Sequence, residues 1–283
     1  MHIPDGFLST PVWIALDATA APAVAYAAKR AQEGFDQSRA PLLGVMGAFV
    51  FAAQMINFPV GIGTSGHLVG GALLACTLGP AAASVVMTAI IVIQSLLFQD
   101  GGVLAMGANI LNMAVAGVLA GYLPYYFWGT GRWRKPALFL AGTSSVLMSA
   151  ILALAELLLS GVKLPTPALG LSLALFAVSA IIEGAITVAA IAALENIQPG
   201  FIRQPAAARH SVLLTSVGLT AALLAAGGVV FASTAPDGIE HLAAQSGLTK
   251  PLANYGGGAG LAGAALVFVL LLVTGRFGRK RSA

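Results

Sequence analysis

The feature that most constrains the fold of this chain is a series of apolar runs, each long enough to cross the roughly 30 Å hydrocarbon core of a bilayer as a helix. Only 8% of the 283 residues are charged and 58% are hydrophobic, whereas a soluble domain carries about 25% charged residues. The alternating pattern of a membrane barrel is not visible. Because backbone groups in lipid must bond one another, the sequence predicts an all-α polytopic membrane protein.

Nine membrane spans are expected from these runs. They lie near residues 9–28, 41–58, 62–79, 81–98, 103–127, 137–159, 168–194, 211–231 and 258–275. The third and fourth are separated only by Gly79-Pro80, a pair that ends a helix. An odd number of spans puts the two ends of the chain on opposite sides of the membrane.

Basic residues indicate the orientation, because Lys and Arg collect in the cytoplasmic segments of membrane proteins. Of the 14 basic residues, only Lys163 and Lys250 lie in the segments that would face outward. The rest lie in segments 29–40, 128–136, 195–210 and 276–283. They are Lys29, Arg30, Arg39, Arg132, Arg134, Lys135, Arg203, Arg209, Arg276, Arg279, Lys280 and Arg281. This predicts an outer amino terminus and an inner carboxyl terminus, and accounts for the net charge of +4 without a nucleic-acid partner.

The chain opens MHIPDGFL, with no basic leader before its first apolar stretch. We therefore expect no cleaved signal peptide and a free amine on Met1. His2 then lies at the outer mouth of the first span, and His67, in GIGTSGHLVGG, lies at the outer end of the third. The Pro4-Asp5-Gly6 turn can fold the terminus back into the bundle.

A chain that begins X-His offers a chelate of three nitrogens, namely the terminal amine, the amide nitrogen of residue 2 and its imidazole. A fourth nitrogen completes a square, which suits Ni²⁺ or Cu²⁺. His67 is the natural fourth ligand, since it is the other outward imidazole in the membrane portion. The competing interpretation is that each histidine is only a polar side chain at the headgroups. Because Cys76 is the single cysteine, the chain can form neither an internal disulfide nor a CxxC metal site.

Several motifs resemble the membrane subunits of energy-coupling-factor transporters for nickel and cobalt, the CbiM/NikM family. They are MHIPDGFLS, FAAQMINFPV, GTSGHLVGGALLA, LFQDGG and GANILNMAVAG. The resemblance covers residues 1 to about 200. It implies a seven-helix substrate-capture (S) component whose amino-terminal segment plugs into the bundle and binds the metal. The implied ligands are the Met1 amine, the His2 amide and imidazole, and the His67 imidazole.

A second resemblance follows residue 200. STAPDGIEHLA is similar to the PDGLE motif of the two-helix NikN-like subunit of these transporters, with Ile239 in place of Leu. The chain then divides into a metal-capture domain (1–200), a basic linker (201–210) and a two-helix accessory domain (211–283). Asp237, Glu240 and His241 in the outer loop are candidate contacts, and the motif is expected to dock against the plug rather than to bind metal.

The resemblance implies a transport subunit that is not itself an enzyme and has no organic cofactor. It would take up Ni²⁺ or Co²⁺ with a transmembrane coupling (T) subunit of the CbiQ/NikQ type and a cytoplasmic ATPase of the CbiO/NikO type. In agreement with this, the sequence has no G-x-x-x-x-G-K-[ST] loop for ATP hydrolysis. The PDGLE-type loop and square-planar geometry favour nickel, and cobalt import for cobalamin synthesis is the alternative.

Two further classes stay open at this point. A metal-dependent membrane enzyme at His2 and His67 would need an open coordination position and a general base. A stand-alone secondary transporter would show internal repeats and charges at the membrane midplane. No convincing repeat relates the halves of this sequence.

Other polar residues within the spans have a structural and a functional interpretation. Asp17, Glu156 and Glu183 are intramembrane carboxylates, for which we favour a structural role while a functional one stays open. Seven uncharged residues are candidates to fix the orientation of the imidazoles, and polar contact between helices is the alternative. They are Gln54, Asn57, Thr64, Ser65, Gln94, Asn109 and Asn112. Gly44, Ala48 and Ala52 form a small-residue face that either packs on a helix of this chain or slides on a partner.

Overall fold

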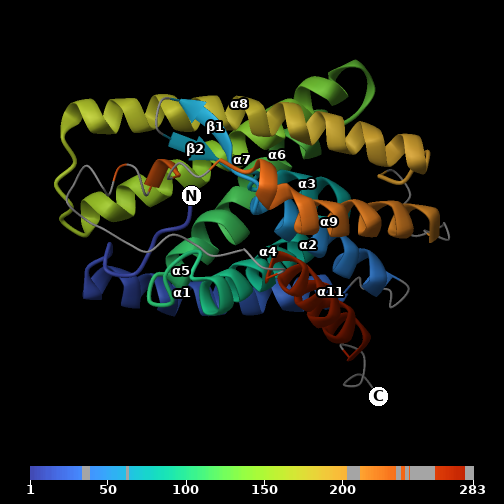
Figure 1. Ribbon diagram of the computed structural model, residues 1–283, viewed down its shortest axis with the longest axis horizontal. Coiled ribbons are helices and arrows are strands. Elements are labelled where there is room, and N and C mark those ends of the chain that lie inside the picture. The colour runs from blue at the N-terminus through green and yellow to red at the C-terminus, as the bar shows by residue number, and fades with distance from the viewer. Residues whose placement is uncertain are drawn as a thin grey trace.

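The computed structural model describes residues 1–33, 39–61, 64–202, 211–233, 237–239, 242 and 259–277. Its helices, in Figure 1, are α1 (Thr10–Glu33), α2 (Ala40–Gln54), α3 (Gly71–Leu78), α4 (Pro80–Ile93), α5 (Met106–Asn109), α6 (Val118–Trp128), α7 (Arg134–Leu159), α8 (Thr166–Ile197), α9 (Ser211–Phe231) and α11 (Ala259–Phe277). The π-helical segment η2 (Gln94–Phe98) extends α4, η3 (Ile110–Gly117) joins α5 to α6, and the 3-10 turn η4 (Gly131–Trp133) precedes α7.

Four of the described helical stretches are long and apolar enough to cross a membrane: Pro80–Phe98, Met106–Trp128, Gly131–Leu159 and Thr166–Ile197. Shorter apolar helices cover Ala40–Gln54, Ser211–Gly227 and Ala259–Gly275. Many of their large apolar side chains stay exposed on the outside of the bundle, as a helix surrounded by lipid requires. The prediction of an all-α polytopic membrane protein is thus confirmed.

The segment 62–79 differs from the uninterrupted span expected there. Strand β2 (Thr64–Gly66) pairs antiparallel with β1 (Phe58–Gly61), and the chain becomes helical only at Gly71. The eight residues of α3 rise only about 12 Å, less than half of the hydrocarbon core. The intervening loop 67–70 is buried within the bundle, which is where non-helical backbone is tolerated at membrane depth. Apolar character alone does not distinguish such a loop from a helix.

The helix ends that carry basic residues gather at one end of the bundle. The end of α1, the turn between α6 and α7, the end of α8 and the start of α9 all lie towards the right of Figure 1, and the amino terminus lies nearer the left. At the basic end Arg134 of α7 donates two hydrogen bonds of 2.6 Å to the Glu195 carboxylate of α8. This grouping agrees with the orientation that the charge distribution predicts.

The carboxyl-terminal helices α9 and α11 both pack on α2. A Cβ added at Gly44 would lie 2.8 Å from the Phe268 ring of α11, and one added at Gly263 of α11 would lie 2.4 Å from the Phe51 ring of α2. Glycines on both helices therefore allow close backbone approach. The small-residue face around Gly44 packs on a helix of this same chain, which decides between its two interpretations.

Candidate metal centre

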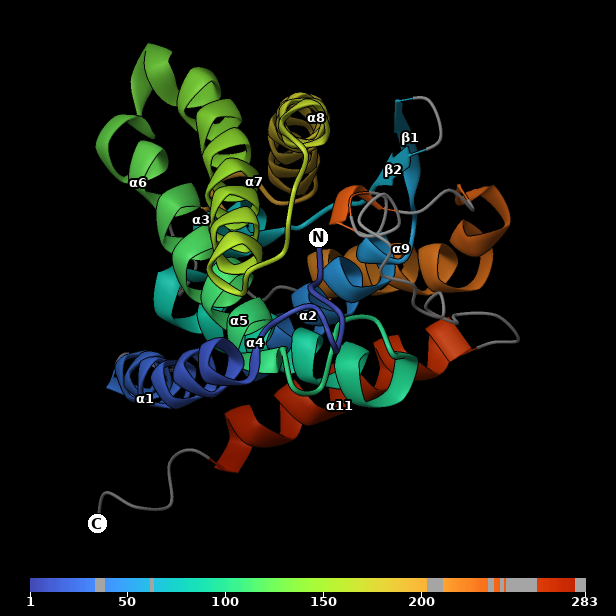
Figure 2. The ribbon, with the colours of Figure 1, turned by 90° about the vertical axis from the view of Figure 1, so that its left-hand side faces the viewer.

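The amino-terminal segment enters the bundle instead of lying at its surface. Met1, His2 and Ile3 are buried, with exposed fractions of 8%, 3% and 0%. Figure 2 shows the terminus near the middle of the molecule, between α8 on one side and α2 on the other. The turn at Gly6, with φ of 85°, sends the chain from this buried segment towards α1, which begins at Thr10. We call residues 1–5 the plug.

Asn109, at the end of α5, holds the backbone of the plug. Its side-chain oxygen accepts a 2.7 Å hydrogen bond from the Ile3 N–H, and its amide nitrogen donates one of 3.0 Å to the Ile3 carbonyl. The Gly102 N–H donates a further 2.9 Å hydrogen bond to the same carbonyl. These bonds satisfy both backbone polar groups of Ile3, a fully buried residue, and fix the position of the residue that follows His2.

The loop after η2 is shaped to receive the plug. The Asp5 carboxylate accepts hydrogen bonds from the N–H groups of Val103 (3.0 Å) and Leu104 (2.7 Å). A Cβ on Gly102 would lie 2.2 Å from an Asp5 oxygen, and one on Gly101 would lie 3.3 Å from the His2 Cβ. The two glycines of LFQDGG thus leave the space that the plug occupies.

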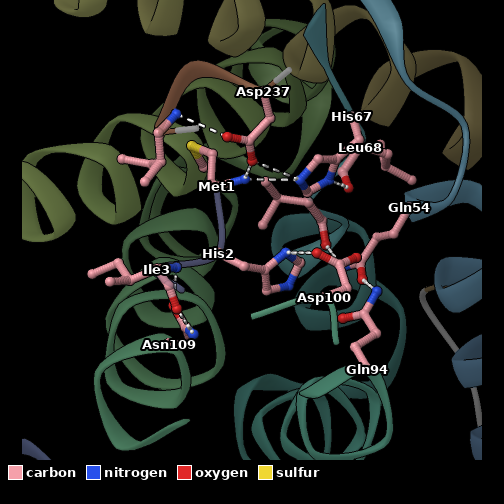
Figure 3. A network of polar contacts seen from close by, with 12 residues as sticks. Met1, His2, Ile3, Gln54, His67, Leu68, Gln94, Asp100, Asn109 and Asp237 are labelled. Carbon is pink, nitrogen blue, oxygen red and sulfur yellow. Dashed lines mark hydrogen bonds and ion pairs between the residues drawn. The ribbon is translucent and has the colours of Figure 1, made fainter. Parts of the chain in front are cut away.

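The Met1 amine meets the His67 imidazole at the inner end of the plug (Figure 3). The amine donates to His67 Nε2 across 2.9 Å, and His67 Nδ1 lies 2.9 Å from the Leu68 carbonyl oxygen. Because a carbonyl only accepts hydrogen bonds, Nδ1 carries the proton, and we assign the neutral tautomer with its lone pair on Nε2. That lone pair points at the first nitrogen of the chain, the orientation a metal-ligating imidazole needs.

His2 lies beside His67 with its ring almost parallel. The ring centroids are 5.5 Å apart and the planes differ by 10°. His2 Nδ1 lies 3.1 Å from an oxygen of Asp100, and neither ring nitrogen of His2 makes a hydrogen bond among the described residues. A buried ring nitrogen without a hydrogen-bond partner costs free energy unless another group, such as a metal ion, binds it. Asp100 is not among the residues predicted from the sequence, although an acidic residue just before Gly101-Gly102, in a break between apolar runs, was a usable signal.

Asp237 brings the carboxyl-terminal part of the chain to the same place. Its carboxylate forms an ion pair with the Met1 amine, and one oxygen lies 3.9 Å from His67 Nε2. The Ile239 N–H donates a 2.8 Å hydrogen bond to the other oxygen, and residue 237 forms a parallel bridge with Ser65 of β2. The motif that contains Asp237 therefore docks on the plug, while Glu240 and His241 lie outside the described residues.

Six of the polar candidates for orienting the imidazoles occupy different places. Gln94, the first residue of η2, donates to Gln54 Oε1 at 2.8 Å, and Gln54 donates to the Val69 carbonyl at 2.7 Å, so this pair supports the loop after His67. Asn109 holds Ile3, as described above, rather than an imidazole. Asn112, within η3, donates to Glu156 at 2.7 Å and is thus paired with a carboxylate of α7. The other two, Thr64 and Ser65, are buried in β2 before His67.

The arrangement offers nitrogen ligands rather than a cluster of acidic or sulfur ligands. No group of three His, Cys, Asp or Glu side chains able to hold a metal ion is found in the described part of the chain. The predicted ligand set needs only two imidazoles, because its other nitrogens are the amine and a backbone amide. Adjacent nitrogens around a square-planar ion, with bonds of about 2 Å, lie about 2.8 Å apart. The observed 2.9 Å between the Met1 amine and His67 Nε2 matches that spacing.

Residues 2–201 match the family described as the cobalt uptake substrate-specific transmembrane region, CbiM. The chain belongs to this family. It is 37% identical to a protein of Archaeoglobus fulgidus named as a fused nickel transport protein, NikMN, over 73% of this chain and 70% of that one. It is 38% identical to a protein of Lactiplantibacillus plantarum named as a fused nickel transport protein, LarMN, over 56% of this chain and 48% of that one.

Solved structures agree with the family assignment. A crystal structure titled as a truncated transition metal transporter aligns with a TM-score of 0.61 and 32% identity, and covers 69% of this chain and 99% of that chain. A second, titled as a transition metal transporter, aligns with the same TM-score at 31% identity. The membrane location and the resemblance to the CbiM/NikM family are confirmed. The chain is a membrane subunit of the nickel and cobalt transport class.

Proposed function

We propose that this protein captures Ni²⁺ or Co²⁺ on the outer side of the membrane. The ligands are the Met1 amine, the amide nitrogen and imidazole of His2, and His67 Nε2. The observation that carries the proposal is the buried approach of the terminal amine to His67 Nε2, at 2.9 Å. The two groups are 66 residues apart in the sequence, and one of them is the terminal amine that an X-His chelate requires.

The surrounding charges suit a divalent cation. The Asp237 carboxylate neutralises the Met1 ammonium, and the Asp100 carboxylate faces His2. When a metal ion replaces protons on the amine and the His2 amide, the same two carboxylates stay beside it. Burying an ion beside opposite charges costs less free energy than burying an isolated ion, which supports metal capture between the plug and His67.

Nickel is the favoured substrate. A chelate of amine, amide and imidazole nitrogens places its donors in a plane, and Ni²⁺ accepts planar nitrogen coordination. Two relatives are also named as fused nickel transport proteins. Cobalt is the second candidate, because the family description refers to cobalt uptake.

We further propose that the chain works as the S component of an energy-coupling-factor importer. Residues 211–283 form its accessory domain, joined by the linker 201–210, most of which lies outside the described residues. The fused relatives and the match that ends at residue 201 support this division. A T subunit and cytoplasmic ATPases would drive release by tilting the bundle, which separates His67 from the plug.

Calorimetric titration with Ni²⁺ and Co²⁺, together with cellular uptake, tests the proposed site. His2→Ala and His67→Ala are expected to abolish tight binding while the protein is produced and folded normally. His210→Ala is the matched control, because the sequence predicts His210 on the inner side. Tight binding by His67→Ala would overturn the ligand set.

A further inference from the structure

The loop that carries His67 is held by a carboxylate from a distant helix. Both oxygens of Glu183, in α8, accept hydrogen bonds of 2.8 Å, one from the Val69 N–H and one from the Gly70 N–H. Glu183 is 1% exposed and forms no ion pair with a cation among the described residues. A buried carboxylate without a cation is costly unless hydrogen bonds satisfy it, and here two peptide N–H groups do so.

The same two N–H groups need this acceptor. Gly70, with φ of 76°, precedes the first residue of α3 and provides no side-chain cap. The Gly70 N–H is one of the groups at a helix start that lack partners within the helix, and the Val69 N–H lies just before it in the same buried loop. Glu183 thus caps α3 from another helix, and its negative charge is favourable at the positive end of the helix dipole.

The loop is also held from the opposite side, because Gln54 of α2 donates to the Val69 carbonyl at 2.7 Å. Gln54 in turn accepts from Gln94 at the start of η2, the segment whose following loop carries Asp100. The backbone of α8 at Glu183 packs closely on α7, since a Cβ at Gly142 of α7 would lie 2.8 Å from the Glu183 backbone carbonyl oxygen. The His67 loop is therefore clamped between α2 and α8.

We propose that Glu183 is a positioning residue for metal capture, tying His67 to helix α8 through the peptide groups of Val69 and Gly70. The inference rests on the proposed function, because it takes His67 as a metal ligand. A displacement of α8 then moves His67 relative to the plug. Glu183 is the mechanical link through which the bundle opens the metal site.

A double-mutant cycle separates this role from a general structural one. Glu183→Gln keeps the shape of the side chain but replaces one acceptor oxygen with an amide nitrogen, which donates and cannot accept. With His67 present, Glu183→Gln is expected to weaken Ni²⁺ binding by about 10- to 100-fold, the usual effect of losing a group that orients a ligand. In the His67→Ala background the same change is expected to alter affinity by less than about twofold.

Glu156→Gln is the matched control, since Glu156 is a buried carboxylate that accepts from Asn112 and not from the His67 loop. The visible absorption of bound Ni²⁺ gives a second readout: the Glu183→Gln spectrum should move towards that of His67→Ala, and the Glu156→Gln spectrum should not. If Glu183→Gln does not fold, Glu183→Asp, which is too short to reach both N–H groups, enters the same cycle.

The positioning role would be overturned if Glu183→Gln bound Ni²⁺ as tightly as the parent protein. It would also be overturned if the change lowered Ni²⁺ affinity equally with His67 present and in the His67→Ala background. Neither result bears on the ligand set, which the His67→Ala protein tests by itself. Tight Ni²⁺ binding by the His67→Ala protein would instead contradict the proposed function on which this inference rests.

Discussion

Replacing Gly102 with alanine tests whether the plug must be docked for metal to bind. The backbone at Gly102 is not in the left-handed region, so the effect of the added methyl group is steric. The new Cβ would lie 2.2 Å from an oxygen of Asp5, 2.5 Å from its nitrogen and 2.8 Å from the Pro4 carbonyl carbon. Non-bonded atoms prefer about 3.5 Å, so the plug must withdraw by about 1 Å.

That withdrawal weakens the three hydrogen bonds that join the plug to the loop after η2. They run from Gly102 to the Ile3 carbonyl and from Val103 and Leu104 to the Asp5 carboxylate. At about 1 kcal/mol each, their loss destabilises the docked plug by about 3 kcal/mol. Since 1.4 kcal/mol is a factor of ten, Ni²⁺ affinity is expected to fall by as much as about 100-fold.

Calorimetric titration of the purified variant measures this loss, and thermal unfolding checks that the bundle is intact. Gly170→Ala, in α8, is the matched control, because its added Cβ meets nothing within 4 Å. A folded Gly102→Ala protein that binds Ni²⁺ as tightly as the parent would show that plug docking is not needed for capture.

Three other changes test the ion pair at Met1, the role of the accessory helices and the competition of protons with the metal. Asp237→Asn removes the negative charge that is paired with the mostly buried Met1 ammonium. The free energy of unfolding of the metal-free protein is therefore expected to fall by up to about 3 kcal/mol. An unchanged unfolding midpoint would contradict the ion pair. Gly44→Leu should force α11 away from α2 at Phe268. Like deletion of residues 211–283, this change is expected to reduce uptake in a transport assay more than it reduces Ni²⁺ affinity in calorimetry. Equal losses of uptake and affinity would argue against a separate role for the accessory helices. Lowering the pH should weaken Ni²⁺ binding, because protons compete with the metal for the amine, amide and imidazole nitrogens. Calorimetric titrations in two buffers should therefore show that protons are released on binding. Ni²⁺ binding that is independent of pH would exclude a deprotonated chelate.

The long apolar helices and the approach of His2 to His67 could be predicted from the sequence, for physical reasons. Length and apolar character suffice to identify a helix that faces lipid. The two histidines could be paired because the charge distribution put both on one side of the membrane. A terminal X-His chelate also supplies only three of the four nitrogens of a square-planar site, so a further imidazole was expected.

The support around the site could not be predicted in the same way. The loop 67–70 is as apolar as a helix, and the acceptor for its N–H groups, Glu183, lies more than 110 residues away along the chain. The π-helical segments η2 and η3, which carry Gln94 and Asn112, have no distinct sequence pattern. Such features depend on which groups lack partners once the helices have packed.

The chemistry of the first residue distinguishes this site from an ordinary pair of buried histidines. One extra residue placed ahead of Met1 leaves both imidazoles unchanged but moves the terminal amine out of the chelate. The most direct measurement is therefore a Ni²⁺ titration of that extended protein beside the protein with its own amino terminus. Tight binding is expected to be lost in the extended protein, and equal affinity in the two proteins would rule out the terminal chelate.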